Sequence, residues 1–165
     1  AIIKACQNDG LISATRTDDI ANLWKARKAL SPLLREIAPK KINEDVVVPV
    51  NTLPQFLDNV TQLSTHYKIN NVNFGHAGNG NIHVNLLINP DDPDEVSRAA
   101  CCLDEIFNLV IKLRGTLSGE HGIGSEKRAF VTKEIDFATL DLMKRIKKVF
   151  DPANILNPGK LFPQN

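Results

Sequence analysis

The feature that most limits what this chain can fold into is the alternation of side chains along residues 81–88, NIHVNLLI. In an extended strand alternate side chains share a face, so Asn81, His83 and Asn85 point one way and Ile82, Val84 and Leu86 point the other. The glycine-rich segment AGNGN (77–81) comes directly before it, and NVNF (71–74) lies on the far side of that turn. Glycine gives such a turn the backbone freedom it needs. We therefore predict a β-hairpin with one polar face and one face buried in a core.

Apolar side chains elsewhere recur at helical spacing, and β-branched runs lie between the helical segments. This alternation predicts the fold class α+β: a ferredoxin-like antiparallel sheet with helices packed on one face. The proline-rich residues 151–165 predict a tail that lies against another surface. The predicted helices span residues 17–37, 53–67, 91–114 and 137–150, and the predicted strands span 10–16, 44–50 and the two hairpin segments, with a further short strand from 115 that runs into a glycine-rich loop.

Composition limits the classes of function. With 165 residues and 42% hydrophobic content the chain fits one domain, and its net charge of +1 argues against a nucleic-acid partner or a charged membrane surface. No apolar run is long enough to span a bilayer, and no signal peptide is visible. The three cysteines, Cys6, Cys101 and Cys102, do not form a disulfide framework, which indicates a reducing compartment. We expect a cytoplasmic protein, or a mitochondrial one in a eukaryote, and the start at Ala1 indicates a fragment or a processed chain.

Two histidines flank the predicted turn. If the hairpin closes through AGNGN, His76 and His83 lie side by side on its polar face, and two neutral imidazoles suit Zn²⁺, Mn²⁺ or Fe²⁺. The segment SGEHGIG (118–124) offers Glu120 as a third, anionic ligand. Two histidines and one glutamate leave an open coordination position, as in catalytic sites. His121 is a candidate acid or base, because imidazole ordinarily exchanges its proton near neutrality.

The spacing by itself leaves other interpretations open. Two histidines beside a turn are commonly hydrogen-bonded surface groups. A Glu-His pair in a glycine-rich loop is also compatible with anion binding through the backbone amides, or with a turn that has no ligand. The pattern therefore favours a metal site without excluding these alternatives.

Three separated segments then identify a resemblance. FGHAGNGNIH (74–83), GTLSGEHGIGSEKR (115–128) and DPANILNPGK (151–160) occur in this order, with LWKARKAL and EDVVVP upstream. Together they are similar to the C-terminal domain of FAD-linked oxidases. The nearest branch is that of the D-2-hydroxy-acid dehydrogenases, which includes D-lactate dehydrogenase, the glycolate oxidase flavin subunit and D-2-hydroxyglutarate dehydrogenase. The resemblance covers essentially the whole chain.

The resemblance implies that residues 1–165 form one substrate-binding cap domain, whose tail at 151–165 faces the flavin. FAD itself would be bound mainly by an N-terminal domain that these residues do not contain. The resemblance also assigns roles by position: metal ligands, with zinc as the usual ion, at His76, His83 and Glu120; the base at His121; substrate contacts at Arg27 and Asn85; and a flavin neighbour at Asn157.

The activity that this implies is oxidation of a small D-2-hydroxy acid, of lactate or glycolate type, to the 2-oxo acid with hydride transfer to FAD. The implied partners are the hydroxy acid, the FAD-binding domain of the same protein and an electron acceptor protein or quinone. We also expect a homo-oligomer, because a cap without its flavin domain would expose apolar surface. The alternatives are the cap of another FAD-linked oxidase with a different substrate, and a metal or interaction module without catalysis.

Overall fold

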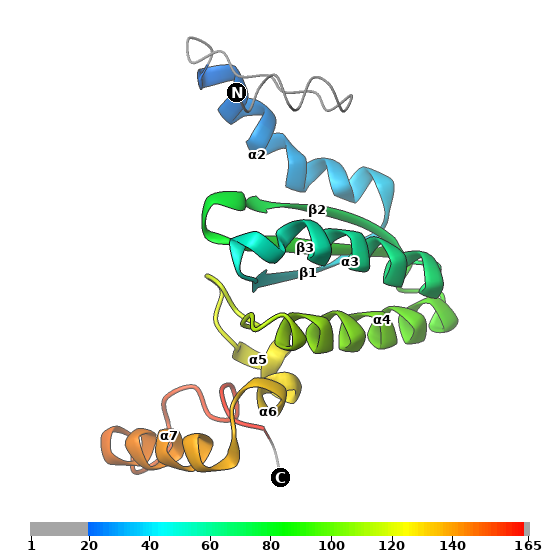
Figure 1. The fold of residues 1–165 in the computed structure, drawn as a ribbon. Helices are drawn as coiled ribbons and strands as arrows, with labels where there is room; N and C mark the ends of the chain where they lie inside the picture. Colours follow the sequence, from blue (N-terminus) through cyan, green and yellow to red (C-terminus); the bar gives the residue numbers. More distant parts are fainter. Residues whose placement is uncertain (1–19, 164–165) are drawn as a thin grey trace. The chain divides into compact units, whose positions relative to one another are not determined.

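The computed structural model describes residues 20–163 of the chain, which divides into two units, residues 1–36 and 37–165. Helix α2 (Ile20–Ile37) confirms the helix predicted at 17–37 over the part that is described. The strand predicted at 10–16 lies outside the described residues. Of the elements within residues 20–163, the second unit contains all the others (Figure 1). It is also the part of the chain that carries the candidate site.

The second unit is built on a three-stranded antiparallel sheet of order β1-β3-β2 (Figure 1). Its strands are β1 (Lys40–Val47), β2 (Asn70–His76) and β3 (Asn81–Ile88). The hairpin predicted from the alternating segment is confirmed, because β2 and β3 pair with His76 opposite Asn81. Every residue of the central strand β3 is buried. The polar row of β3 is therefore an interior feature of the protein and not a solvated surface.

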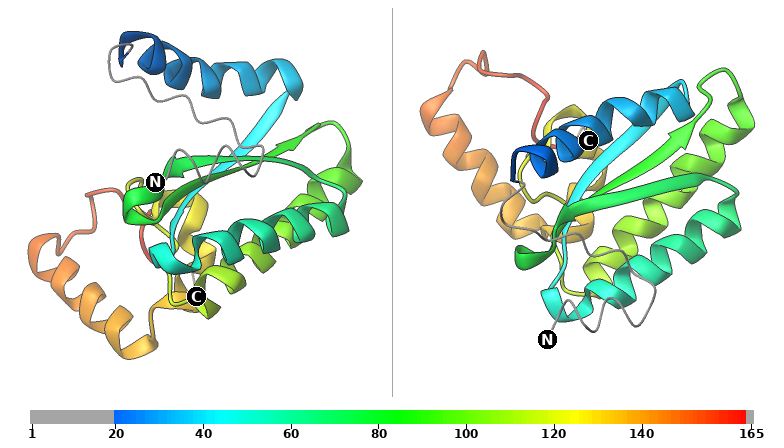
Figure 2. Two further views of the ribbon diagram at one scale, coloured as in Figure 1. Left: turned by 45° about the horizontal axis from the view of Figure 1, so that its top comes forward. Right: turned by 90° about the horizontal axis from the view of Figure 1, so that it is seen from above.

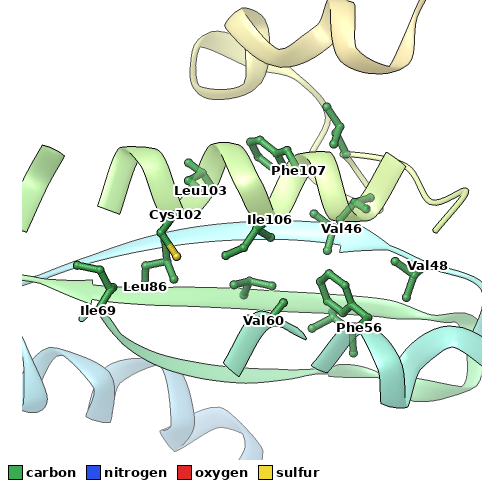
Figure 3. Close-up of a cluster of buried hydrophobic side chains, with 14 of the residues drawn as sticks. Val46, Val48, Phe56, Val60, Ile69, Leu86, Cys102, Leu103, Ile106 and Phe107 are labelled. Atoms are coloured by element: carbon green, nitrogen blue, oxygen red, sulfur yellow. The ribbon is translucent and has the colours of Figure 1, made fainter. Parts of the chain in front are cut away.

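Helices α3 (Leu53–Tyr67) and α4 (Pro93–Lys112) run side by side along one face of this sheet (Figure 2). One face of β3 belongs to the same buried cluster as Phe56 of α3 and Ile106 of α4, which places both helices on that face (Figure 3). The β3 side chains in this cluster are Ile82, Val84, Leu86 and Ile88. Burial of such side chains contributes about 1.5–3 kcal/mol each. The predicted α+β class, with an antiparallel sheet and helices on one face, is thus confirmed.

The order strand-helix-strand-strand-helix is that of a ferredoxin-like unit, in which a last strand would complete the sheet beside β1. The short strand predicted from residue 115 is wrong: only Thr116 bridges to β1, through its pair with Val47. Beyond it the backbone N–H groups bond to side chains, since Leu117 donates to the Glu134 carboxylate at 2.8 Å. The segment therefore leaves the sheet after one residue.

The strand predicted at 44–50 lies instead at 40–47. Pro49 has no N–H to donate to a ladder, and a 3₁₀ turn, η2 (Val50–Thr52), follows it. The predicted helices at 53–67 and 137–150 are confirmed with the same bounds, and the one predicted at 91–114 spans 93–112. Helix α4 begins where the Asp92 carboxylate accepts the N–H groups of Asp94 and Glu95.

The remaining described elements are a 3₁₀ turn in the hairpin, three short helical segments after α4 and the last helix. They are η3 (Ala77–Asn79) in the hairpin turn, then α5 (Gly124–Lys127), η4 (Arg128–Phe130), α6 (Val131–Glu134) and α7 (Phe137–Phe150). The described cysteines, Cys101 and Cys102, are free thiols. Over residues 20–163, no helix has both the length and the apolar character that a membrane span requires.

Candidate metal centre

The β2–β3 hairpin brings two histidines together on the sheet face opposite α3 and α4. His76 is the last residue of β2, and His83 is the third residue of β3, where it pairs with Phe74. Their ring centroids lie 6.0 Å apart. His83 is 9% exposed, whereas the His76 side chain is 41% exposed. One imidazole is thus anchored in the interior and the other reaches the surface beside it.

Glu120 joins these histidines from the loop that follows Thr116. The distance between His76 Nε2 and Glu120 Oε1 is 3.4 Å. One ligand atom from each of His76, His83 and Glu120 lies within 4.8 Å of the other two. In a tetrahedral site with bonds near 2.1 Å, ligand atoms lie about 3.4 Å apart. The donor set and its spacing therefore fit one divalent ion, with the half-exposed side chains leaving room for a further ligand.

Burial also favours the form of His83 that can coordinate a metal. Desolvation lowers the pKa of this imidazole below its ordinary value, while the neighbouring Glu120 carboxylate works in the opposite direction. The net effect favours the neutral ring, which has a free lone pair at one nitrogen. The lowered pKa therefore makes the His83 ring more available to a cation than the ring of a solvated surface histidine.

His121 lies next to this cluster without being one of its three members. Its ring stacks on that of His83, with centroids 5.4 Å apart and planes inclined by 25°. Its side chain belongs to an exposed residue, so the imidazole is accessible from outside. The structure thus places the predicted acid or base beside the predicted ligands, where it can reach a molecule bound at the open side.

Asn85, predicted to contact substrate, lies on β3 two residues beyond His83 and is completely buried. Its Oδ1 accepts a hydrogen bond from Asn43 at 2.7 Å, and its Nδ2 donates to the carbonyl oxygens of Val72 and His83. In this structure the Asn85 amide therefore joins all three strands. A contact between Asn85 and substrate stays a prediction.

The other two predicted residues lie on other segments. Arg27 is exposed on α2, in the first unit, with its guanidinium 5.4 Å from the centroid of the Trp24 ring. Asn157 is exposed in the tail and has a left-handed backbone conformation, with φ of 47°. Their roles toward substrate carboxylate and flavin stay predictions.

Sequence reasoning missed three residues that hold the cluster together. Asn81 Nδ2 donates to Glu120 Oε1 at 2.6 Å, and Asp45 and Lys127 form a buried ion pair 2.9 Å long behind the Glu120 loop. A usable signal existed for Asp45, because an acidic residue inside the β-branched run EDVVV is costly to bury without a partner. No comparable signal pointed to Lys127 among 20 basic residues.

Glycines let these groups approach one another. A methyl group at Gly119 would lie 2.8 Å from Asn81 Nδ2 and 2.9 Å from a methyl carbon of Val47. Any larger residue at position 119 would thus displace the amide that holds the Glu120 carboxylate. This requirement explains the glycine directly before the Glu-His pair.

Comparison with known proteins gives a family match over most of the chain and several similar curated proteins. The model of the family described as FAD linked oxidases, C-terminal domain, matches residues 1–161. The chain is similar to the glycolate oxidase subunit GlcD of Bacillus subtilis, with 33% identity over 100% of this chain and 35% of the relative. It is also similar to the D-2-hydroxyglutarate dehydrogenase of Stutzerimonas stutzeri, with 37% identity over 93% of this chain and 33% of the relative.

A third relative comes from a vertebrate. The zebrafish (Danio rerio) protein named "Probable D-lactate dehydrogenase, mitochondrial" is 34% identical over 86% of this chain and 29% of its own length. The chain thus spans about a third of the length of the curated relatives that it matches.

Proposed function

This chain belongs to the FAD linked oxidases, C-terminal domain family, and from that membership we propose that it is the substrate-binding cap of an enzyme that oxidises a small D-2-hydroxy acid to the 2-oxo acid. The printed names of the relatives support this substrate class, since they are glycolate oxidase, D-2-hydroxyglutarate dehydrogenase and D-lactate dehydrogenase. These names differ in the acid but share an α-hydroxy carboxylate. The proposal therefore extends to that group and not to one acid.

The observation that carries the proposal is the convergence of His76, His83 and Glu120, with His121 stacked beside them. We propose that the first three side chains hold one divalent ion, with zinc as the expected metal. When bound, the ion would make the substrate hydroxyl more acidic, and FAD would take the hydride from Cα. The oxidation removes one hydride and one proton from the hydroxy acid, so the site needs a proton acceptor as well.

The chain's own residues supply that acceptor and the orientation of the substrate. His121 would take the hydroxyl proton on an imidazole nitrogen, because its ring is exposed and adjoins the three ligands. Arg27 would pair with the substrate carboxylate, for which its planar guanidinium is well shaped. Asn85 would line the substrate side of the site, and Asn157 would lie near the flavin ring.

Apolar side chains on α7 and the tail support the proposed partner, an FAD-binding domain of the same protein. Phe137, Phe150 and Ile155 are 83%, 80% and 75% exposed. Large apolar side chains that are this exposed are expected where another protein surface covers them. Where that domain is missing, the same surface would favour self-association. In the complete protein, with its FAD-binding domain, the reduced flavin would pass its electrons to an acceptor protein or a quinone.

Replacing His121 with alanine tests the proposed proton acceptor. We expect turnover of D-lactate, glycolate or D-2-hydroxyglutarate by the full-length protein to fall about a hundredfold, since general bases contribute at least that much. The backbone N–H of residue 121, which donates to Asp45, is kept in this variant. The measurement is steady-state turnover together with the FAD content of the purified protein.

The control is His66→Ala, which removes an exposed histidine that contacts Tyr67 on α3. Turnover unchanged in His121→Ala would refute the assignment of the base. No flavin reduction by any of the three acids in the wild-type protein would refute the substrate class and favour another FAD-linked oxidase. A wild-type protein that binds metal but reduces no flavin would favour a metal-binding module.

Asn81→Ala should weaken metal binding without removing a ligand. The Asn81 amide donates to the Glu120 carboxylate, and partners of this kind typically account for about a 10–100-fold change in metal affinity. We expect a loss within that range in a competitive zinc titration, with Asn59→Ala on the exposed face of α3 as the control. An affinity equal to the wild-type value would show that Glu120 either does not ligate or needs no support.

A further inference from the structure

Three charged side chains are buried at the edge of the sheet beside the candidate site. Asp45 is 0% exposed, Lys127 is 3% exposed and Glu44 is 6% exposed. Burying charges is costly, and an apolar replacement of a buried ion pair is often neutral or stabilising. Stabilisation of the core therefore does not by itself explain why these three charged side chains are buried.

The Asp45 carboxylate is bound to three consecutive backbone amides of the glycine-rich loop. Its Oδ1 accepts from the N–H of Gly119 at 3.3 Å, and its Oδ2 accepts from the N–H groups of Glu120 and His121, the latter at 3.0 Å. Asp45 lies on β1 directly opposite His83 in the strand register. Asp45 thus pairs with one candidate ligand, His83, and binds the backbone of another, Glu120.

Lys127 ties the two ends of the same loop to that carboxylate. Its ammonium donates to Asp45 Oδ1 at 2.9 Å, to the Asp45 carbonyl oxygen at 2.7 Å and to the Leu117 carbonyl oxygen at 2.7 Å. All three ammonium protons are therefore used, and Glu44 Oε2 lies 3.5 Å away. Leu117 precedes the loop and Lys127 follows it, so one ammonium group closes the segment between them.

The ionised state of Asp45 is part of this arrangement. Burial by itself would raise the pKa of the carboxyl, but the hydrogen bonds from the Glu120 amide, Lys127 and the His121 amide lower it to about 2. The carboxylate therefore stays charged at neutral pH and remains an acceptor for all of these donors.

We infer that the Asp45–Lys127 ion pair is a positioning device for Glu120 and His121, setting where the third ligand and the proton acceptor stand relative to His76 and His83. This inference rests on the proposed metal centre. It adds two residues that touch neither the ion nor the substrate and act through the loop at 117–121. Asn81 holds the Glu120 carboxylate from β3, and Asp45 holds the Glu120 backbone from β1.

The test separates positioning from a contribution to folding. In the full-length protein, the double variant Asp45→Asn/Lys127→Met removes both charges and keeps similar side-chain shapes, so it avoids leaving one buried charge unpaired. We expect it to fold, to bind Co²⁺ about 10–100-fold more weakly and to show an altered Co²⁺ absorption spectrum. We also expect faster amide hydrogen exchange in peptides that cover residues 117–121.

The matched control is Lys133→Met, which breaks the partly exposed Lys133–Asp104 pair of 3.0 Å on other elements. It should leave Co²⁺ affinity and exchange of residues 117–121 unchanged. Unchanged affinity and spectrum in a folded double variant would overturn the inference, and so would a double variant that fails to fold, since the pair would then serve the fold. If the wild type binds no Co²⁺, the metal proposal fails, and amide exchange decides whether the pair orders the loop: faster exchange supports that ordering and unchanged exchange overturns it.

Discussion

His83→Ala should leave the protein unable to retain a divalent ion, where the wild type is expected to carry about one ion per chain. His83 is the most buried of the three candidate ligands, and the pKa shift caused by its burial favours the neutral, coordinating ring. Without it, His76 and Glu120 are two half-exposed groups, and two such ligands hold an ion weakly. The measurement is metal content after purification without chelators, followed by a competitive zinc titration.

The matched control for this prediction is again His66→Ala, because His66 is an exposed histidine of the same unit away from the cluster. It should keep the full metal content. An ion retained in His83→Ala would contradict the proposed ligand set. A wild type that holds no ion, even after incubation with zinc, would instead leave the histidines as groups that act on the substrate directly.

Gly80→Ala should lower the free energy of unfolding by about 2–5 kcal/mol, through a left-handed backbone conformation and a steric overlap. Gly80 has φ of 77° at the end of the hairpin turn. A methyl group there would overlap the carbonyl oxygen of Val48, and the Gly80 carbonyl accepts the Val48 N–H at 3.1 Å. The change therefore pushes the turn away from the end of β1. Urea unfolding followed by circular dichroism measures the loss.

Gly78→Ala in the same turn is the control. An added methyl group at Gly78 meets no atom within 4 Å, and this residue is not among the glycines with positive φ. We expect a change of no more than about 0.5 kcal/mol. Equal losses in the two variants would mean that the turn tolerates no side chain for reasons unrelated to Val48, and the steric argument would fail.

Local sequence patterns predicted those helices and strands in which apolar side chains recur along one face. Helices α3 and α7 have the predicted bounds because apolar side chains recur along one side of each and because Asp136 caps the second. Strand β3 has its predicted bounds because its alternation allows a single register against a buried face. The β2–β3 turn followed from its glycines, and with it the juxtaposition of His76 and His83.

The segment after residue 115 was predicted wrongly because its backbone bonds depend on distant side chains. A strand forms when consecutive N–H and C=O groups pair with a neighbouring strand. Here the N–H groups of Leu117, Gly119 and His121 are taken by carboxylates of Glu134 and Asp45. Those acceptors lie 17 to 76 residues away along the chain, and no local pattern marks them.

The sequence alone determined the two-faced hairpin, the helices that cover its apolar face and the pair of histidines at its turn, because periodicity and turn residues act over a few positions. The tertiary structure decided where Glu120 and His121 stand. Their loop is held by Asn81, Asp45 and Lys127, and the contact between the last two joins residues 82 positions apart. Such contacts depend on the fold of the whole chain, because a buried charge meets a partner that is distant in sequence only in the folded protein.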